Sequence, residues 1–242
     1  MITVLSVISD QGIYMSAADK SIDGRLIECA RKEFLDKGFE KASLRNICKS
    51  ANVTTGALYK RFNGKEELFS AIVEDTVDFI MNCMKYKDEL SRKPQSDEFL
   101  VKCWRLSDED MLDWFKAIMD HKEPFTMLIR CSSGTKYQDF EHELAMNMSE
   151  SNYRFYMQAY ERGIAKTRIS KNDLHILDSA YWKVICEPFI HDYSWEEIIA
   201  LSNNVCLFMD YYRLLGIDKG LIEKFGKSEN RIFNYSLTEE HI

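Results

Sequence analysis

The sequence contains few of the residues that interrupt helices. Only three prolines and ten glycines occur among its 242 residues. Proline inside a helix removes a backbone hydrogen bond and clashes with the preceding turn, so its scarcity leaves long stretches that can be helical. Short strands at regular spacing with glycine-rich turns between them, which are typical of β-sandwiches, are also missing. The composition therefore predicts an all-α protein.

Disulfide bonds and membrane segments are not predicted either. The seven cysteines are an odd number and no two have Cys-x-x-Cys spacing, so we expect reduced, buried thiols and neither a disulfide framework nor a zinc site. Residues 1–9 are apolar, but they are too short to span a bilayer and lack both a basic leader and a small-residue cleavage site. We therefore expect a cytoplasmic protein without a signal peptide.

Patterns of catalytic and metal-binding residues are missing as well. The sequence has no glycine-rich phosphate loop, no nucleophile elbow and no paired-carboxylate arrangement. Four of the histidines, His121, His142, His175 and His191, do not have the spacing of zinc ligands. We predict no metal, no cofactor and no catalytic residue.

Apolar residues at three-to-four spacing predict a series of helices. The first runs from about residue 23 to 37 and precedes Gly38, which suits the left-handed position that follows a helix. Ser43 is predicted to cap a second helix that ends at residues 51–52, where asparagine tolerates positive φ. Thr54 is predicted to cap a short third helix. Two helices joined by so short a turn predict a helix-turn-helix unit.

A long fourth helix is predicted to begin with a capping-box-like sequence, Asn-Gly-Lys-Glu, at residues 63–66. Further helices are predicted over residues 97–105, 108–121, 125–133, 137–163, 171–190 and 194–215, with a break at 188–193. The chain is predicted to consist of an N-terminal extension at 1–20, a three-helix domain at 21–67, a helical domain at 68–216 and a tail at 217–242. The extension is expected to be poorly ordered, and Met15 is a second candidate for the start of the protein. Leu221, Phe225 and Phe233 are the tail residues expected to dock.

Positive charge is concentrated in one segment of an otherwise acidic chain. Residues 41–65 contain six Lys or Arg and no Asp or Glu, so they carry +6 while the whole chain carries −7 and the remainder −13. Neutralisation of phosphates supplies most of the nonspecific affinity of proteins for nucleic acid. Because the segment coincides with the predicted helix-turn-helix unit, double-stranded DNA is the expected partner. A solvated basic helix face is the alternative interpretation.

The segment from Leu26 to Leu68 resembles the DNA-binding domain of the tetracycline-repressor (TetR) family of transcriptional regulators. The matching residues, which span about a fifth of the chain, are Leu26, Ile27, Ala30, Phe34, Gly38, Phe39, Ile47, Ala51, Val53, Gly56, Leu58, Tyr59, Phe62, Lys65, Glu66, Glu67 and Leu68. Glu33, Asn46, Asn52 and Thr55 depart from the family pattern, which usually has apolar, acidic, glycine and basic residues there. The resemblance implies an N-terminal three-helix helix-turn-helix domain joined to a C-terminal helical ligand-binding and dimerisation domain.

The third helix has the small first turn that a recognition helix needs to approach the major groove. The residues placed to read bases are Thr54, Thr55, Ala57 and Lys60. Tyr59 and the remaining basic residues of the segment are expected to contact phosphates. Lys65 is expected to add its charge to the start of the fourth helix. The predicted DNA-binding residues are Ser43, Arg45, Thr54, Thr55, Gly56, Ala57, Tyr59, Lys60, Arg61 and Lys65.

The resemblance also implies a homodimer that forms through the last two long helices and binds a palindromic operator. The predicted interface residues are Tyr181, Trp182, Ile185, Phe189, Ile198, Leu201, Val205, Phe208, Met209 and Tyr212. The alternative is that these side chains pack within a single chain.

Finally, the resemblance implies that a small apolar effector binds in the helical domain and releases a repressor from DNA. The predicted pocket residues are Trp104, Trp114, Phe115, Met119, Phe125, Met127, Cys131, Tyr153 and Tyr156, with Phe140, Met146 and Tyr160 as further candidates. Each of these side chains is also a candidate for ordinary core. Control by a protein partner is the alternative for the regulator, and a helical enzyme is a more distant one.

Overall fold

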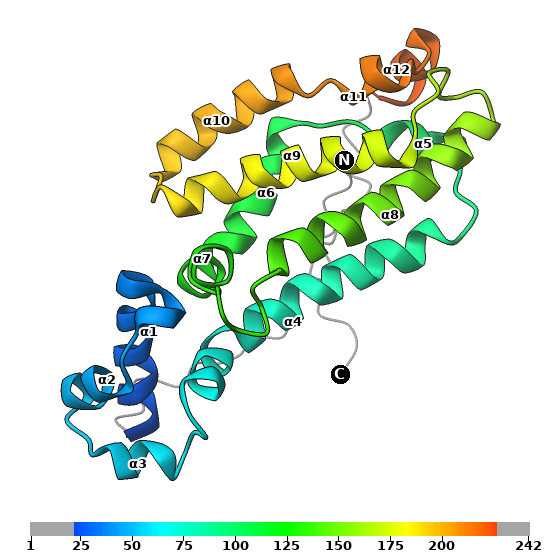
Figure 1. Ribbon diagram of the computed structural model, residues 1–242. Helices are drawn as coiled ribbons and strands as arrows, with labels where there is room; N and C mark the ends of the chain where they lie inside the picture. Colours follow the sequence, from blue (N-terminus) through cyan, green and yellow to red (C-terminus); the bar gives the residue numbers. More distant parts are fainter. Residues whose placement is uncertain (1–21, 227–242) are drawn as a thin grey trace, which may run out of the picture.

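A computed structural model describes residues 22–226, and this part of the chain is helical and contains no strand (Figure 1). The helices are α1 (Ile22–Lys41), α2 (Leu44–Ala51), α3 (Thr55–Tyr59), α4 (Lys65–Ser91), α5 (Asp97–Lys102), α6 (Asp108–Met119), α7 (Lys122–Arg130), α8 (Phe140–Glu161), α9 (Lys171–Ile190), α10 (Trp195–Phe208), α11 (Tyr211–Leu215) and α12 (Lys219–Phe225). The all-α prediction is confirmed. The predicted extension at 1–20 and Phe233 in the tail lie outside the described residues.

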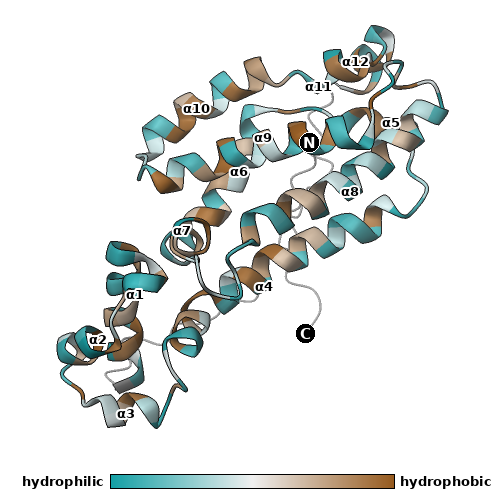
Figure 2. Ribbon diagram, viewed as in Figure 1, coloured by the Kyte–Doolittle hydropathy of each residue, from teal (hydrophilic) through white to brown (hydrophobic). Residues whose placement is uncertain are grey.

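The helices form a small unit and a larger one, which α4 connects. Helices α1 to α3 lie together at one end, and α4 leaves them to run beside α8, which in turn packs against α9 (Figure 1). The colouring by hydropathy alternates along α4 and α8, as expected of helices that bury one face (Figure 2). No helix within residues 22–226 is long and apolar enough to cross a membrane.

Buried apolar side chains hold the small unit together. Leu26, Ala30 and Phe34 of α1 are buried, and the ring of Phe34 meets that of Phe69 on α4 edge to face at a centroid distance of 5.1 Å. Gly38 takes φ 73°, so regular helical geometry stops where the sequence predicted. The start of α4 therefore contributes to the core of the small unit.

The local signals at the ends of α2 and α3 are confirmed. The Ser43 hydroxyl accepts a hydrogen bond from Asn46 N at 3.4 Å, and the Thr54 hydroxyl accepts one from Ala57 N at 3.1 Å. Asn52 ends α2 with φ 54°. These caps satisfy backbone groups that a short helix leaves free, and they fix the turn between the two helices.

The start of α4 differs from the prediction. Gly64, with φ 135°, precedes the helix and no side chain caps it, so the capping box at residues 63–66 is wrong. Glu67 accepts a hydrogen bond from Asn63 N at 2.7 Å instead. The positive φ of Gly64 lets the chain turn sharply into α4, and the helix begins there without the predicted side-chain cap.

The C-terminal end of the chain contains more breaks than the sequence predicted. The prediction of one helix over residues 194–215 is wrong, because α10 ends at Phe208 and α11 begins at Tyr211. Asp210 caps α11 by accepting a hydrogen bond from Arg213 N at 2.9 Å, which stabilises the new start. The predicted helix over 171–190 is confirmed and contains Pro188, so the break lies only after Ile190. Leu221 and Phe225 are partly buried on α12, which packs against α5.

Helix α7 joins the two units. Arg31 on α1 forms an ion pair with Glu123 on α7, and Phe39 N donates a hydrogen bond to Cys131 O at 3.0 Å. Lys136 N donates to Glu66 at 2.9 Å. Helix α7 and the segment that follows it therefore link the larger unit to α1 and to the start of α4.

Candidate functional site

The exposed face of α3 is made of small side chains. Thr54, Thr55 and Gly56 are exposed, and Tyr59 follows with 59% of its surface accessible, while Leu58 is buried and anchors the helix. A Cβ atom added at Gly56 would meet only Thr54 Oγ1, at the ordinary contact distance of 3.9 Å. The fold therefore does not require a glycine here, and the start of α3 exposes only small side chains.

Four exposed cationic residues lie on α1, on α2 and directly after α3. The residues are Lys41, Arg45, Lys49 and Lys60, and none of their side chains forms a hydrogen bond or ion pair with another residue of 22–226. Because these side chains form no ion pair within residues 22–226, their charges remain available to an anionic partner. Two of them, Arg45 and Lys60, belong to the predicted DNA-binding set.

Lys65 and Arg61, by contrast, hold the small unit together. The Lys65 ammonium donates to Glu40 O at 2.9 Å and to Ala42 O at 3.2 Å, and it lies over the Phe39 ring at 4.5 Å. Arg61 forms an ion pair with an acidic residue of α1, Asp23, and also donates to a backbone oxygen of α3. Two of the three donors of the Lys65 ammonium thus join the end of α1 to the start of α4, and the phosphate contact predicted for Lys65 stays a prediction.

Glu33 is a residue whose role the sequence analysis missed. Its carboxylate accepts hydrogen bonds from Lys37 Nζ at 2.9 Å, Ser43 N at 3.2 Å and Asn46 Nδ2 at 3.3 Å. Burial raises the pKa of the Glu33 carboxyl, but these hydrogen bonds outweigh burial and hold the pKa below its usual range. Glu33 and Asn46 both depart from the family pattern, and in this fold their side chains form a hydrogen bond with each other. Together they fix the start of α2 on α1.

Glu33→Ala is expected to lower the free energy of unfolding by about 1–2 kcal/mol, because it leaves these donors without their charged acceptor. Since the pKa of Glu33 is lowered in the folded state, this stabilisation is present above the unfolded pKa of about 4.3 and disappears as the pH falls through the folded value. Urea unfolding at pH 7 and pH 3 measures both effects. The exposed Glu89→Ala serves as control; an equal effect of the two variants would contradict the role of Glu33.

The predicted pocket residues lie in the core of the larger unit. Seven of the nine are buried, namely Trp104, Trp114, Phe115, Phe125, Met127, Cys131 and Tyr156, and Met119 and Tyr153 are partly buried. Their contacts are with other core side chains; the Trp114 ring, for example, meets the Trp182 ring edge to face at 5.4 Å. Of the further candidates, Phe140 is buried and Met146 and Tyr160 are exposed. These positions thus match ordinary core, and whether they also enclose an effector stays a prediction.

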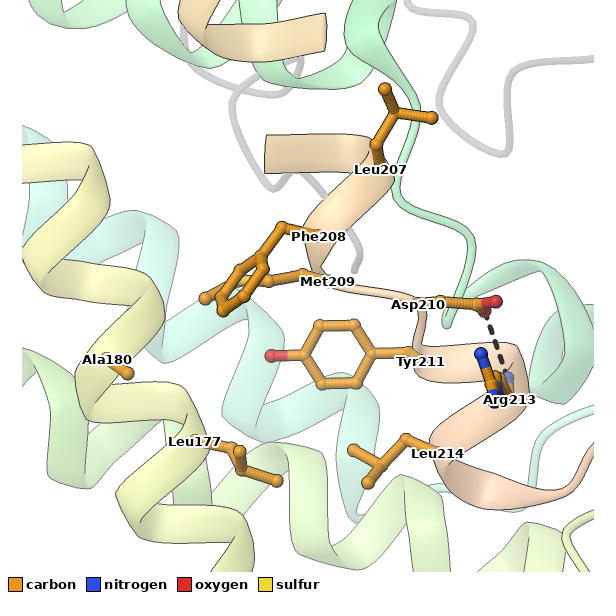
Figure 3. A pocket seen from close by; sticks show the side chains of 9 residues that line it. All are labelled: Leu177, Ala180, Leu207, Phe208, Met209, Asp210, Tyr211, Arg213 and Leu214. Carbon is orange, nitrogen blue, oxygen red and sulfur yellow. Dashed lines mark hydrogen bonds between the residues drawn. The ribbon is translucent and has the colours of Figure 1, made fainter. Parts of the chain in front are cut away.

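A groove of about 680 Å³ lies where α10 ends, against α9 and α11 (Figure 3). Its lining residues are Leu177, Ala180, Leu207, Phe208, Met209, Asp210, Tyr211, Arg213 and Leu214. Figure 3 shows the Tyr211 ring between Phe208 and Met209 on one side and Leu214 on the other. None of the predicted pocket residues lines this groove. The break between α10 and α11, which the sequence did not predict, creates it.

Most of the residues predicted for the dimer interface are covered within the single chain. Six of the ten predicted residues are buried within the chain, namely Tyr181, Trp182, Ile185, Phe189, Ile198 and Val205. Three more are partly buried, namely Leu201, Met209 and Tyr212. Of the predicted set only Phe208 is largely exposed, at 82%. Other apolar side chains of α9 and α10 are exposed instead, namely Ile176, Ile199 and Leu207 at 65%, 38% and 83%. Helical periodicity identifies the apolar face of a helix, but it does not tell whether other helices of the same chain pack against that face or leave it exposed.

Comparison with known proteins places the small unit in a family. Residues 26–72 match the family described as bacterial regulatory proteins, tetR family. The HTH-type transcriptional regulator UidR of Escherichia coli (strain K12) is 43% identical over 49 residues, which are 20% of this chain and 25% of that protein. The probable HTH-type transcriptional regulator ArpR of Pseudomonas putida is 35% identical over 69 residues, 27% of this chain and 33% of that protein. The matching segment thus spans a quarter to a third of these relatives.

A likeness to a solved structure extends over most of the chain. The crystal structure of the TetR family transcriptional regulator PfmR from Thermus thermophilus superimposes with a TM-score of 0.50 and 13% sequence identity. The match covers 81% of this chain and 97% of that one. At this level of identity the comparison supports the fold alone, in both the small and the larger unit.

Proposed function

Because the chain belongs to the tetR family of bacterial regulatory proteins, whose members are transcriptional regulators and not enzymes, we propose that it binds duplex DNA and represses transcription. The observation that carries this proposal is the exposed first turn of α3, made of Thr54, Thr55 and Gly56 and flanked by cations that have no partner within residues 22–226. Groove entry requires small side chains, and phosphate binding requires free charge.

In this proposal α3 enters the major groove and α2 lies across it. Thr54, Thr55 and Ala57 reach base edges, and Tyr59 extends its hydroxyl to the phosphate backbone, since it is exposed at the end of α3. We assign Arg45 and Lys60 to phosphates on either side, which for Lys60 replaces the base contact that the sequence suggested. Glu33 acts indirectly, because it holds α2 on α1 and so sets the angle at which both helices meet the DNA.

We further propose that two copies associate through the exposed apolar face of α9 and α10, which consists of Ile176, Ile199, Leu207 and Phe208. Phe208 projects beside the groove that it helps to line, so a knob and a hollow lie on the same surface. A two-fold axis brings identical patches together, and a surface that carries both shapes can complement itself. Two α3 helices related by such an axis fit a palindromic operator with half-sites about 34 Å apart.

A small-molecule effector is proposed to bind in the larger unit and weaken DNA binding. Helix α4 runs from the core of the small unit into the larger one, and α7 adds a second connection through Arg31 and Glu123. A tenfold release of DNA requires about 1.4 kcal/mol of difference in affinity for the DNA-bound and free conformations, and DNA must weaken effector binding by the same factor.

Binding of a duplex from the promoter region, measured over a range of salt concentrations, tests the DNA proposal. We expect log affinity to fall steeply with log salt, and Lys60→Gln to reduce the slope by about one. Lys85→Gln, which changes an exposed lysine of α4 far from α3, should leave the slope unchanged. Binding that does not depend on salt, or no binding of any promoter duplex, would rule the proposal out.

A further inference from the structure

The groove at the end of α10 combines apolar walls with two polar side chains that have no side-chain partner within residues 22–226. Its volume of about 680 Å³ lies in the range of roughly 300–1,000 Å³ that is typical of small-molecule sites. Leu177 of α9 and Leu214 of α11 are among the side chains that form the apolar walls. Such walls suit the apolar body of a ligand, and the polar groups decide what else the ligand must carry.

The first of the two polar groups is the hydroxyl of Tyr211. The residue is 4% exposed, and its hydroxyl forms no hydrogen bond with another residue of the described part of the chain. Figure 3 shows this hydroxyl pointing toward the part of α9 with Leu177 and Ala180, which also line the groove. Burial raises the pKa of the phenol, so the hydroxyl stays protonated and can donate. An oxygen atom of a ligand would supply the acceptor that this hydroxyl lacks.

The second polar group is the guanidinium of Arg213, which is exposed and forms no ion pair within residues 22–226. Asp210 is the other charged residue of the lining, and it accepts a hydrogen bond from the backbone N–H of Arg213 at 2.9 Å. That bond caps α11 and does not use the guanidinium. The guanidinium is therefore available to a ligand carboxylate, which it can hold through two parallel hydrogen bonds.

We propose that the groove binds a small carboxylate that has an apolar body and a neutral oxygen at its far end. The carboxylate pairs with Arg213, the body packs on the apolar walls, and the far oxygen accepts a hydrogen bond from Tyr211. This order of parts follows from Figure 3, in which the Tyr211 hydroxyl points away from Arg213. A cationic head has the same sign of charge as the guanidinium and is disfavoured.

The groove also lies on the surface through which two copies are proposed to associate, and this step rests on that proposed function. Leu207 and Phe208 line the groove and are 83% and 82% exposed. A ligand in the groove fills the hollow that Phe208 of a second copy would enter. The ligand and the second copy therefore compete, and the ligand shifts dimers toward monomers. Fewer dimers mean weaker binding to an operator with two half-sites.

Three probes test the proposal: phenylbutyrate, its para-hydroxyl derivative and phenylbutylammonium. Isothermal titration calorimetry with the full chain at pH 7 should show phenylbutyrate binding about fivefold more tightly than phenylbutylammonium, because its head pairs with Arg213. The para-hydroxyl derivative should bind about fivefold more tightly again, because its hydroxyl bonds to Tyr211. Equal affinities of the three probes, or tighter binding of the ammonium, would overturn the proposal.

Two variants remove one polar group each. Arg213→Gln keeps the backbone N–H that bonds to Asp210, and it should abolish or reverse the preference for phenylbutyrate over phenylbutylammonium. Tyr211→Phe keeps the ring and should abolish only the advantage of the para-hydroxyl derivative. Lys219→Gln, which changes an exposed lysine outside the groove, should keep all three affinities. Folded Arg213 and Tyr211 variants that retain the wild-type preferences would also overturn the proposal.

A further variant separates the ligand site from the proposed dimer. Ile199→Glu changes the proposed dimer face but no residue that lines the groove. It should bind the probes in the wild-type order and more tightly, because no second copy covers the groove. If no probe binds to this variant or to the wild type, the ligand site is wrong.

Sedimentation velocity of the wild type with a saturating amount of the para-hydroxyl derivative should show a shift toward monomers. A dimer that stays intact while the head-group preferences hold would contradict the proposed dimer surface and leave the ligand site in place. Dimers that bind promoter DNA but show no head-group preference would do the reverse.

Discussion

Phe208→Glu is expected to convert the protein from dimers to monomers at micromolar concentration. Phe208 is 82% exposed in the single chain, so a glutamate there is well hydrated and should not disturb folding. In the proposed dimer the same carboxylate would be buried at the contact between α10 helices without a partner, which costs several kcal/mol. Sedimentation velocity measures the change in mass, and a thermal unfolding curve checks that the monomer stays folded.

The loss of the dimer should also lower the affinity for a two-site operator by about 100-fold, since the second half-site no longer binds as part of the same molecule. Met146→Glu is the matched control, because Met146 is an exposed apolar residue of α8 at 41% and does not line the groove. This control should remain dimeric. A dimer that persists in Phe208→Glu would place the interface on another surface.

The sequence was most informative where structure depends on neighbouring residues. Gly38, Ser43, Asn52 and Thr54 were each predicted from their own backbone or capping preference, and each acts as predicted. A cap or a positive φ involves groups only a few residues apart, so a short stretch of sequence contains all the information needed. The helix-turn-helix unit could therefore be predicted almost in full.

Contacts between distant residues could not be predicted in the same way. Glu33 and Asn46 looked like two separate departures from a family pattern, and only the packing of α2 on α1 shows that they form one hydrogen bond. Lys65 looked like a free charge at the start of α4, but the chain 23 and 25 residues earlier supplies two carbonyl oxygens to it. Counting charges along the sequence locates a basic segment. It does not tell which of its cations already form hydrogen bonds or ion pairs inside the protein.

The larger unit shows a further limit of sequence patterns. Trp182 and Phe208 both continue an apolar stripe, yet Trp182 is buried against the core and Phe208 faces outward. Hydrophobic spacing alone cannot separate side chains that fill a core from those that stay exposed in the single chain. The break at residues 209–210 depends on Asp210, which caps α11 although the residues before it have no helix-stopping signal. Proline and glycine are the usual signals, and neither occurs there.

Gly56→Trp is expected to abolish specific DNA binding while the protein remains folded. The position is exposed, its φ is not positive, and an added Cβ atom meets only Thr54 Oγ1 at 3.9 Å, so we expect the fold to tolerate a side chain there. In the proposed complex that space is the major groove, and an indole would hold α3 away from the bases. The affinity for the specific operator should fall by about 10³-fold, to the level of nonspecific binding.

Gly56→Ala is the control for this variant. It adds only a methyl group and raises helix propensity, so the protein should gain about 0.5 kcal/mol of stability and lose little DNA affinity. Electrophoretic mobility shifts with operator and scrambled duplexes measure the affinities, and circular dichroism during heating measures stability. An unfolded Gly56→Trp protein would make the glycine a structural requirement, whereas a folded one that binds operator normally would show that α3 does not enter the groove through its first turn.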